Sequence, residues 1–184
     1  MQIYSVHVLF GGVKISAMSK KTIQTGITGE FLAAAELTIR GYAAALTLKN
    51  SPNIDILVSD GFSVKAIQVK TVNGPKADWP CPLPKAVSKD LVYILVNLKP
   101  KDSDTPDFYI VPSAIVKKVV NKIDAEYAKK YFARHGKISE GKGVYHFKDE
   151  EGLYKNKWKN LGLKTIKPEK QTNKPKPAGK RKGE

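Results

Sequence analysis

The sequence predicts an α/β fold in which a mixed β-sheet is flanked by helices. Three observations predict it. A helical pattern at 28–40 is followed by three short segments rich in β-forming residues, a nearly continuous apolar run fills 92–98, and a second long helical pattern covers 113–134. The expected order of elements is therefore α, β, β, β, loop, β, β, α.

The first helix is predicted by the segment TGEFLAAAELTIR at 28–40. It is rich in helix-forming residues, and its apolar residues recur at helical spacing. Those apolar residues are Phe31, Leu32, Ala35 and Ile39. Gly41 follows directly and predicts the end of the helix.

Three strands are expected next, at 42–49, 54–59 and 63–71. The second and third are separated by Asp60-Gly61, a dipeptide that favours a two-residue hairpin turn because both residues tolerate positive φ. In that register Ser59 pairs with Phe62, and Asp55 lies opposite Ala66.

The segment 73–89 contains four prolines and is expected to be an irregular loop. The run VYILVNL at 92–98 predicts a strand buried on both faces, and 108–111 predicts another short strand.

The second helix is expected to open at Pro112-Ser113, to run to about Arg134 and to end at Gly136. After it, the pattern predicts a minor strand at 144–147 and a final helix at 150–161.

The domain organisation follows from composition. We expect an N-terminal extension at 1–22, one folded domain at 23–163 and a disordered tail at 164–184. The tail has eight basic residues, two acidic residues and three prolines, and its few apolar side chains cannot offset the entropy lost on ordering.

The charge of the chain points to a polyanionic partner. The 184 residues carry a net charge of +15, which favours nucleic acid over a membrane surface. No apolar run has the length of a membrane span. A single cysteine, Cys81, rules out a disulfide framework and a cysteine-based zinc cluster within the chain, and suits a cytoplasmic location.

Polar residues of the kinds that bind ligands or take part in catalysis gather on the predicted hairpin. Because side chains alternate between the faces of a strand, Asp55, Gln68 and Lys70 are expected on one face, while apolar residues occupy the other. Asp55 would then be diagonal to Gln68, roughly 7–8 Å away between backbones. A charged group on such a face needs a partner. Two interpretations stay open, an Asp55–Lys70 ion pair or a metal site with its water.

Two further features are less specific. Glu30, near the start of the first helix, either joins that site or stabilises the positive end of the helix dipole. The proline-rich segment places one aromatic residue among lysines, which could grip a nucleic-acid backbone or stack a base. These residues are Lys76, Trp79, Lys85 and Lys89. Trp79 could equally be a lid over the core.

The helical Glu30, the strand residue Asp55 in PNIDILV, and Gln68-Val69-Lys70 in VKAIQVKT resemble the PD-(D/E)XK nuclease superfamily. The resemblance covers about residues 23–111 and implies a restriction endonuclease-like αβββαβ core. Gln68 stands where the family usually has Asp or Glu, and this Gln-x-Lys form is similar to that of a cyanobacterial intron homing endonuclease. Ile54 directly precedes Asp55, so the literal Pro-Asp pair is absent.

The resemblance implies a Mg²⁺-dependent DNA endonuclease, with Mn²⁺ expected to substitute. Asp55 would be the main metal ligand, Gln68 a neutral oxygen ligand, and Glu30 a ligand directly or through water. Oxygen ligands of this kind suit Mg²⁺. Lys70 would orient the attacking water and offset charge in the transition state. Products with 5′-phosphate and 3′-hydroxyl ends are expected of the family.

Two alternatives stay open. The chain could be an inactive member that binds DNA or a protein partner, since replacing a carboxylate by Gln68 weakens ion binding, or it could be an RNA-directed nuclease. A palindromic target would require a homodimer or a higher symmetric oligomer, because two strands need two sites.

Overall fold

The computed structural model describes residues 9–10, 13–14, 20–48, 53–82, 87–99, 105–139 and 143–164. The chain folds as an α/β protein with a mixed sheet and two long helices. Its elements, in chain order, are β1 (Leu9–Phe10), β2 (Val13–Lys14), α1 (Lys20–Ile39), β3 (Ala43–Leu46), β4 (Ile56–Ser59), β5 (Val64–Val72), β6 (Asp78–Pro82), β7 (Leu91–Asn97), β8 (Asp107–Pro112), α2 (Ser113–His135), β9 (Val144–Lys148) and the 3₁₀-helix η1 (Trp158–Leu161).

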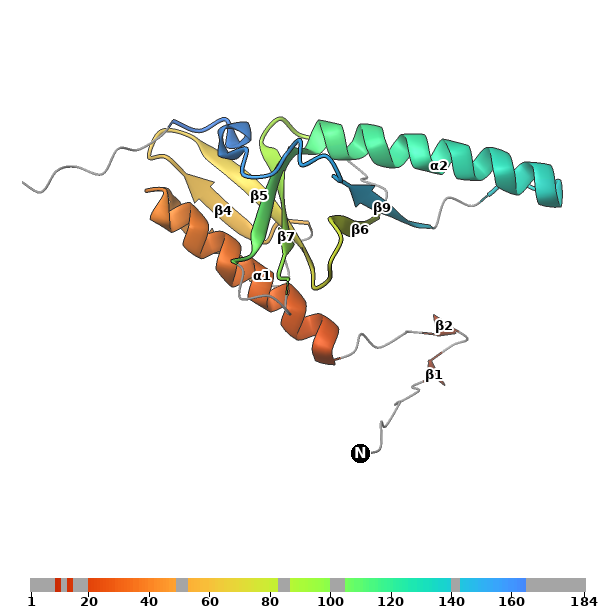
Figure 1. Ribbon diagram of the computed structural model, residues 1–184, viewed down its shortest axis with the longest axis horizontal. Helices are drawn as coiled ribbons and strands as arrows, with labels where there is room; N and C mark the ends of the chain where they lie inside the picture. Colours follow the sequence, from red (N-terminus) through yellow and green to blue (C-terminus); the bar gives the residue numbers. More distant parts are fainter. Residues whose placement is uncertain are drawn as a thin grey trace, which may run out of the picture.

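The central sheet has five strands in the order β3-β4-β5-β7-β8. The pair β5–β7 is parallel, and the other three pairs are antiparallel. β6 and β9 form a separate antiparallel pair, as do β1 and β2. In Figure 1, α1 and α2 lie on either side of the sheet, and the outer half of α2 extends beyond it.

α1 covers one face of the sheet through small residues. Gly29, Ala33 and Leu37, spaced four residues apart, are buried, and Ala33 and Leu37 belong to the core cluster with Ile56, Ile67 and their neighbours. Two of the apolar residues whose spacing predicts this helix, Phe31 and Ile39, are 61% and 75% exposed. A helix that approaches a sheet closely needs small side chains at the contact, so the Gly29–Ala33 side faces inward.

The other face is covered by α2 and by the β6–β9 pair. Val116 and Val120 of α2 pack with Tyr93 and Leu95 of β7 and with Trp79 of β6 in a second core cluster. The prediction of a strand buried on both faces at 92–98 is confirmed, because β7 lies between the two clusters. Gly136, at φ 63°, ends α2 as expected.

The β4–β5 hairpin has a longer turn than Asp60-Gly61 predicted. Ser59 pairs with Val64, so the loop has four residues, and the expected Ser59–Phe62 pairing was wrong. Asp60 does not adopt positive φ; its Oδ1 instead accepts hydrogen bonds from the backbone N–H groups of Phe62 (2.9 Å) and Ser63 (2.7 Å). The side chain of Asp60 thereby builds a turn that competes with the two-residue form.

The loop expected at 73–89 contains a strand, β6. Its residues alternate, with Trp79 and Cys81 buried and Pro80 and Pro82 exposed. Proline is tolerated here because β6 pairs with β9 alone, and an edge strand can lack some N–H donors.

The helix expected at 150–161 is absent apart from η1. The Asp149 carboxylate accepts N–H groups of Leu153 (2.9 Å) and Tyr154 (2.8 Å), which holds the chain in turns. The backbone then bonds the outer edge of β8, from Ile110 N–H to Tyr154 O (3.0 Å) and from Asn156 N–H to Phe108 O (2.8 Å). Bonds to the edge strand therefore replace bonds within a helix.

Most of the predicted tail, from residue 165 onward, lies outside the described residues, as does most of the N-terminal extension. Lys164 is described: its backbone N–H donates to Asp60 Oδ2 (2.7 Å). The three backbone hydrogen bonds, with that from Lys164 the largest effect, lower the pKa of Asp60 below its usual range.

We expect Gly29→Ala to destabilise the fold by about 1–3 kcal/mol. A Cβ at this position would lie 1.8 Å from Thr71 Oγ1 and 2.8 Å from Thr71 Cβ, so α1 would have to move away from β5. Urea unfolding measures the change in the free energy of unfolding.

Gly26→Ala is the matched control, because nothing lies within 4 Å of a Cβ there and the same helix is changed. It should stabilise by up to about 1 kcal/mol. Thr71→Ala should partly rescue Gly29→Ala. Equal effects of the two glycine substitutions would refute the proposed close contact.

Candidate functional site

Asp55 and Gln68 lie side by side at the point where β4 leaves β5. Ile56 is opposite Ile67, and continuing this register brings Asp55 directly beside Gln68 rather than diagonal to it. The expected pairing of Asp55 with Ala66 was therefore wrong by two residues. A shift of two preserves the alternation of faces, so Leu57 of β4 shares a face with Ala66, Gln68 and Lys70 of β5, and Asp55 lies just outside this regular pairing.

The Asp55 carboxylate is fixed by the backbone of β5. Val69 N–H donates to Asp55 Oδ2 (2.7 Å), and Asp55 N–H donates to Ile67 O (2.8 Å), which departs from the regular ladder by one residue. In the described part of the chain, Asp55 Oδ1 has no hydrogen-bond partner. Where the ladder is interrupted, Val69 N–H therefore binds Asp55 Oδ2, and Asp55 Oδ1 is left available.

Gln68 and Lys70 have unused bonding capacity. Gln68 is only 6% exposed, yet its side-chain amide makes no hydrogen bond to another described group. The described buried side-chain atoms that lack a partner are Arg40 Nε, Thr71 Oγ1 and Trp158 Nε1, and the Gln68 amide is not among them, so this amide still has access to solvent. Lys70 is half-buried and forms no ion pair with the described residues. The simple Asp55–Lys70 ion pair is not formed.

Tyr93 and Cys81 adjoin this group, and neither was predicted to. Tyr93 pairs with Gln68 in the parallel β5–β7 register and is 5% exposed. Burial, with smaller contributions from Cys81 and Asp55, raises the pKa of Tyr93 to about 12. Burial also raises the pKa of Cys81 to about 11, and Lys70 acts in the opposite direction. The sequence signal for Tyr93 was its place in the apolar run at 92–98, but only the strand pairing places it beside Gln68.

Glu30 comes from the helix on the opposite face of the sheet. Its neighbour Gly29 lies against Thr71 of β5. Thr71 directly follows Lys70, so Glu30 and Lys70 lie near the same end of this strand. The structure therefore brings Asp55, Gln68 and Lys70 together along β5, and Glu30 lies near the same end of this strand on the α1 side.

The lysine-rich segment after β5 is only partly as predicted. Trp79 is fully buried, and its indole N–H donates to Val96 O (2.9 Å), so it cannot stack on a base. This burial fits the alternative interpretation, in which Trp79 is a lid over the core. Lys76 and Lys89 are exposed, and Lys85 lies outside the described residues.

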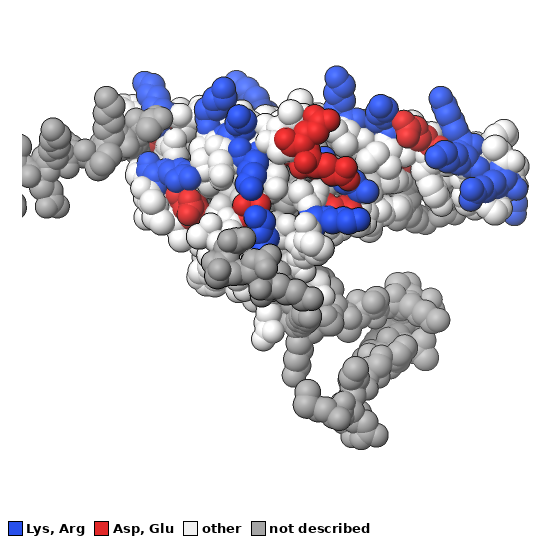
Figure 2. Space-filling view, viewed as in Figure 1, with Lys and Arg blue, Asp and Glu red and all other residues white. Residues whose placement is uncertain are grey.

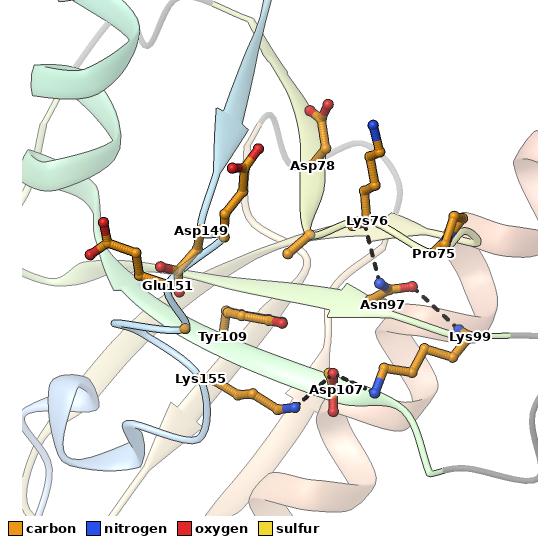
Figure 3. Close-up of a pocket in the computed structure, with 13 residues that line it drawn as sticks. Pro75, Lys76, Asp78, Asn97, Lys99, Asp107, Tyr109, Asp149, Glu151 and Lys155 are labelled. Atoms are coloured by element: carbon orange, nitrogen blue, oxygen red, sulfur yellow. Dashed lines mark hydrogen bonds and ion pairs between the residues drawn. The ribbon is translucent and has the colours of Figure 1, made fainter.

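A cavity of about 570 Å³ lies near the carboxyl end of β7 (Figure 3). Asn97 Nδ2 donates to Lys76 O (3.3 Å), and Asp107 lies between Lys99 (2.7 Å) and Lys155 (2.9 Å). Burial acts to raise the pKa of Asp107, but the two lysines outweigh it and the pKa is lowered. These contacts hold the loops around β6. The cavity does not include Asp55, Gln68 or Lys70.

α2 carries a basic surface. It has six Lys and Arg residues against two acidic ones. At 3.6 residues per turn, Lys118, Lys122 and Lys129 fall within about 40° of one another, roughly opposite the buried Val116 and Val120. All three are exposed. Figure 2 shows basic side chains gathered over the outer end of this helix. We call these three residues the α2 lysine stripe.

Comparisons with protein-family models, curated proteins and solved structures found no match for this chain. Within the described residues, no set of three or more His, Cys, Asp or Glu side chains is arranged to bind a metal. Neither described helix is long and apolar enough to cross a membrane.

We expect the Cys81 thiol to be protected from reagents in the folded protein. It is 1% exposed beneath the β6–β9 pair, and its pKa of about 11 leaves little thiolate at pH 8. Native protein at pH 8 should react with a disulfide reagent at least about 100-fold more slowly than urea-unfolded protein, in which the same single cysteine serves as its own control. Equally fast reaction in both states would show that β6–β9 does not cover this face.

Proposed function

We propose that this protein is a Mg²⁺-dependent DNA endonuclease of the PD-(D/E)XK type. One observation carries the proposal. The Asp55 carboxylate, fixed by Val69 N–H, lies against β5 beside the Gln68 amide and Lys70, and neither of these two side chains is paired with another described group.

The donor set suits a hard cation. Asp55 Oδ1 and Gln68 Oε1 are oxygen donors, and neither is used by the described protein groups. Glu30 would join directly or through a water molecule. Mg²⁺ typically keeps several waters and takes one or two carboxylates beside a substrate phosphate, and Mn²⁺ accepts the same ligands. When bound, the ion would polarise the scissile phosphate and lower the pKa of a bound water.

The chain's own residues have distinct tasks in this scheme. Val69 N–H holds the Asp55 carboxylate in place before any ion binds, which avoids reorganisation during the reaction. Gln68 contributes an oxygen without adding a negative charge. Lys70 supplies a fixed positive charge that orients the attacking water and offsets the charge developing on the phosphate. The expected products have 5′-phosphate and 3′-hydroxyl ends.

The basic surface supports DNA as the substrate. α2 packs on the same face of the sheet as Tyr93, the neighbour of Gln68, so the α2 lysine stripe and the site belong to one side of the molecule. Lysines that neutralise phosphates release counterions and so favour binding. For a palindromic target two copies are required.

A second candidate function is that of an inactive member that binds DNA without cutting it. Gln68 favours it, because an amide in place of a carboxylate removes one negative charge from the ion's surroundings and weakens binding. An RNA-directed nuclease would use the same residues on another substrate.

We expect plasmid nicking and cleavage of a four-way junction in Mg²⁺ or Mn²⁺, and none in EDTA. Asp55→Ala and Lys70→Ala should each reduce the rate by about 100-fold or more. Lys65→Ala is the matched control for Lys70, because Lys65 is on the same strand and pairs with Asp90 (2.7 Å) away from the site. Rates are measured by gel electrophoresis of the products.

If no DNA is cut in either metal while wild type and Asp55→Ala bind DNA alike, the nuclease proposal is wrong and the inactive candidate replaces it. Cleavage of RNA alone would support the third candidate. If Lys65→Ala lowers the cleavage rate as much as Lys70→Ala does, Lys70 has no special role in cleavage.

We expect the triple variant of the α2 lysine stripe, with alanine at 118, 122 and 129, to bind duplex DNA more weakly and with less salt dependence. Each phosphate contact contributes about 0.9 to the slope of log K against log salt concentration, so the slope should fall by about 2–3. Fluorescence anisotropy with labelled duplex at several salt concentrations measures it.

Its control replaces Lys157, Lys159 and Lys164 by alanine, which removes the same charge from the segment that packs on the α1 face through Trp158 and Leu163. This variant should keep the wild-type slope to within about one contact. Equal loss of slope in both triple variants would indicate attraction by net charge alone.

A further inference from the structure

The inward side of α2 changes character where the helix leaves the sheet. Over the sheet this side carries Val116 and Val120, both fully buried. At 3.6 residues per turn, Tyr127 and Tyr131 fall within about 60° of these valines and continue the same side of the helix. In Figure 1 this outer half of α2 extends past the sheet. Aromatic residues therefore follow the valines at the point where the central sheet no longer covers the helix.

Three rings stand one above the other on the outer half of α2. The ring centroids of Tyr127 and Tyr131 are 5.9 Å apart, and those of Tyr131 and His135 are 4.6 Å apart. Tyr127 is 49% exposed, His135 is exposed and Tyr131 is half-buried. We call these three residues the α2 aromatic ladder. Exposed rings of this kind are surfaces on which unpaired bases stack.

A cavity of about 660 Å³ opens beside the ladder, between α2 and the start of β9. Its walls include Ile123, Tyr127, Tyr131 and Tyr145. The Tyr145 hydroxyl donates a hydrogen bond to Asp124, which ties β9 to the helix and fixes this wall. The volume is within the range of ligand pockets, about 300–1,000 Å³, and aromatic walls suit a planar ligand.

The charge around the ladder complements a phosphate backbone. Residues 127–139 contain four basic side chains and no Asp or Glu. The basic residues are Lys129, Lys130, Arg134 and Lys137, and all four are exposed. Lys137 also lines the cavity. Figure 2 shows basic side chains over this end of the helix. Rings bordered by cations fit a strand whose bases stack on the protein while its phosphates remain in solvent.

A single strand fits this arrangement better than a duplex does. In a duplex the bases are already paired and stacked, so placing one against a protein ring first requires that it be unpaired and unstacked. An unpaired base is available without that cost.

We propose that the α2 aromatic ladder binds single-stranded DNA, with unpaired bases stacked on Tyr127 and Tyr131 and the phosphates held by Arg134 and Lys137. The inference goes beyond the proposed function, because it involves neither Asp55 nor a metal ion. It also gives the chain a base-stacking surface away from the buried Trp79.

The test is binding of fluorescein-labelled oligo-dT, of about 12 nucleotides, to the full chain in EDTA, measured by fluorescence anisotropy. The double variant Tyr127→Leu with Tyr131→Leu keeps apolar side chains but removes both rings. It should bind oligo-dT at least about 10-fold more weakly, and duplex of the same length less than about 2-fold more weakly.

The matched control is Tyr127→Phe with Tyr131→Phe, which keeps both rings and removes only the hydroxyls. It should bind oligo-dT within about 2-fold of wild type. Thermal unfolding of each variant separates loss of binding from loss of fold. Photocrosslinking of wild type to oligo-dT that carries 5-iodouracil, followed by mass spectrometry of the peptides, tests the same contact without any substitution. The crosslinks should fall on Tyr127, Tyr131 or His135.

Three results would overturn the ladder proposal. They are unchanged oligo-dT binding in the leucine variant, equal loss in the leucine and phenylalanine variants, and crosslinks only outside 127–135. Unchanged oligo-dT binding together with self-association that the leucine variant abolishes, measured by sedimentation without DNA, would instead make the ladder an interface between copies.

The outcomes also separate this proposal from the nuclease. Ring-dependent binding of oligo-dT in EDTA by a protein that cuts no substrate in Mg²⁺ or Mn²⁺ supports the ladder and contradicts the nuclease. Cleavage by a protein whose oligo-dT binding does not depend on the rings contradicts the ladder alone.

Discussion

The parallel pairing of β5 with β7 is the constraint on which the rest of the structure depends. β7 is buried on both faces, so the sheet has to be covered on both sides, by α1 on one and by α2 with β6–β9 on the other. A parallel pair also requires a crossover, and the described part of this crossover contains β6 and no helix. The same pairing places Gln68 beside Tyr93, so the register that builds the core also builds the candidate site.

The two faces of the sheet are closed by different means. Small residues let α1 approach β5 closely, whereas the opposite face is filled by large side chains such as Trp79 and Phe147. Towards β4 this face is less covered, since Leu57 is 43% exposed, whereas Gln68 and Tyr93 are 6% and 5% exposed. Asp55 lies against β5 next to Gln68, between the covered and the more open part of the sheet.

Short-range patterns predicted much of the fold. Periodicity identified α2, the strands of the central sheet and the second part of α1, and Gly41 and Gly136 marked the helix ends, because these signals depend on residues within one or two turns. α1 begins at Lys20, within the predicted N-terminal extension and eight residues before the predicted helix. The patterns were wrong where a side chain or a distant strand competes for backbone hydrogen bonds. Asp60 lengthened the hairpin turn, and the outer edge of β8 held 152–156 in place of a helix.

By itself, the sequence determined that Gln68 and Lys70 share a face, because alternation along a strand does not change when the register shifts by two. It also determined the basic character of the chain and its single cysteine. Only the tertiary structure decided that Asp55 lies beside Gln68, that Trp79 belongs to the core and that Tyr93 is the partner of Gln68 in β7. These facts depend on pairing between strands far apart in sequence, and no local pattern specifies which residues a parallel register will bring together.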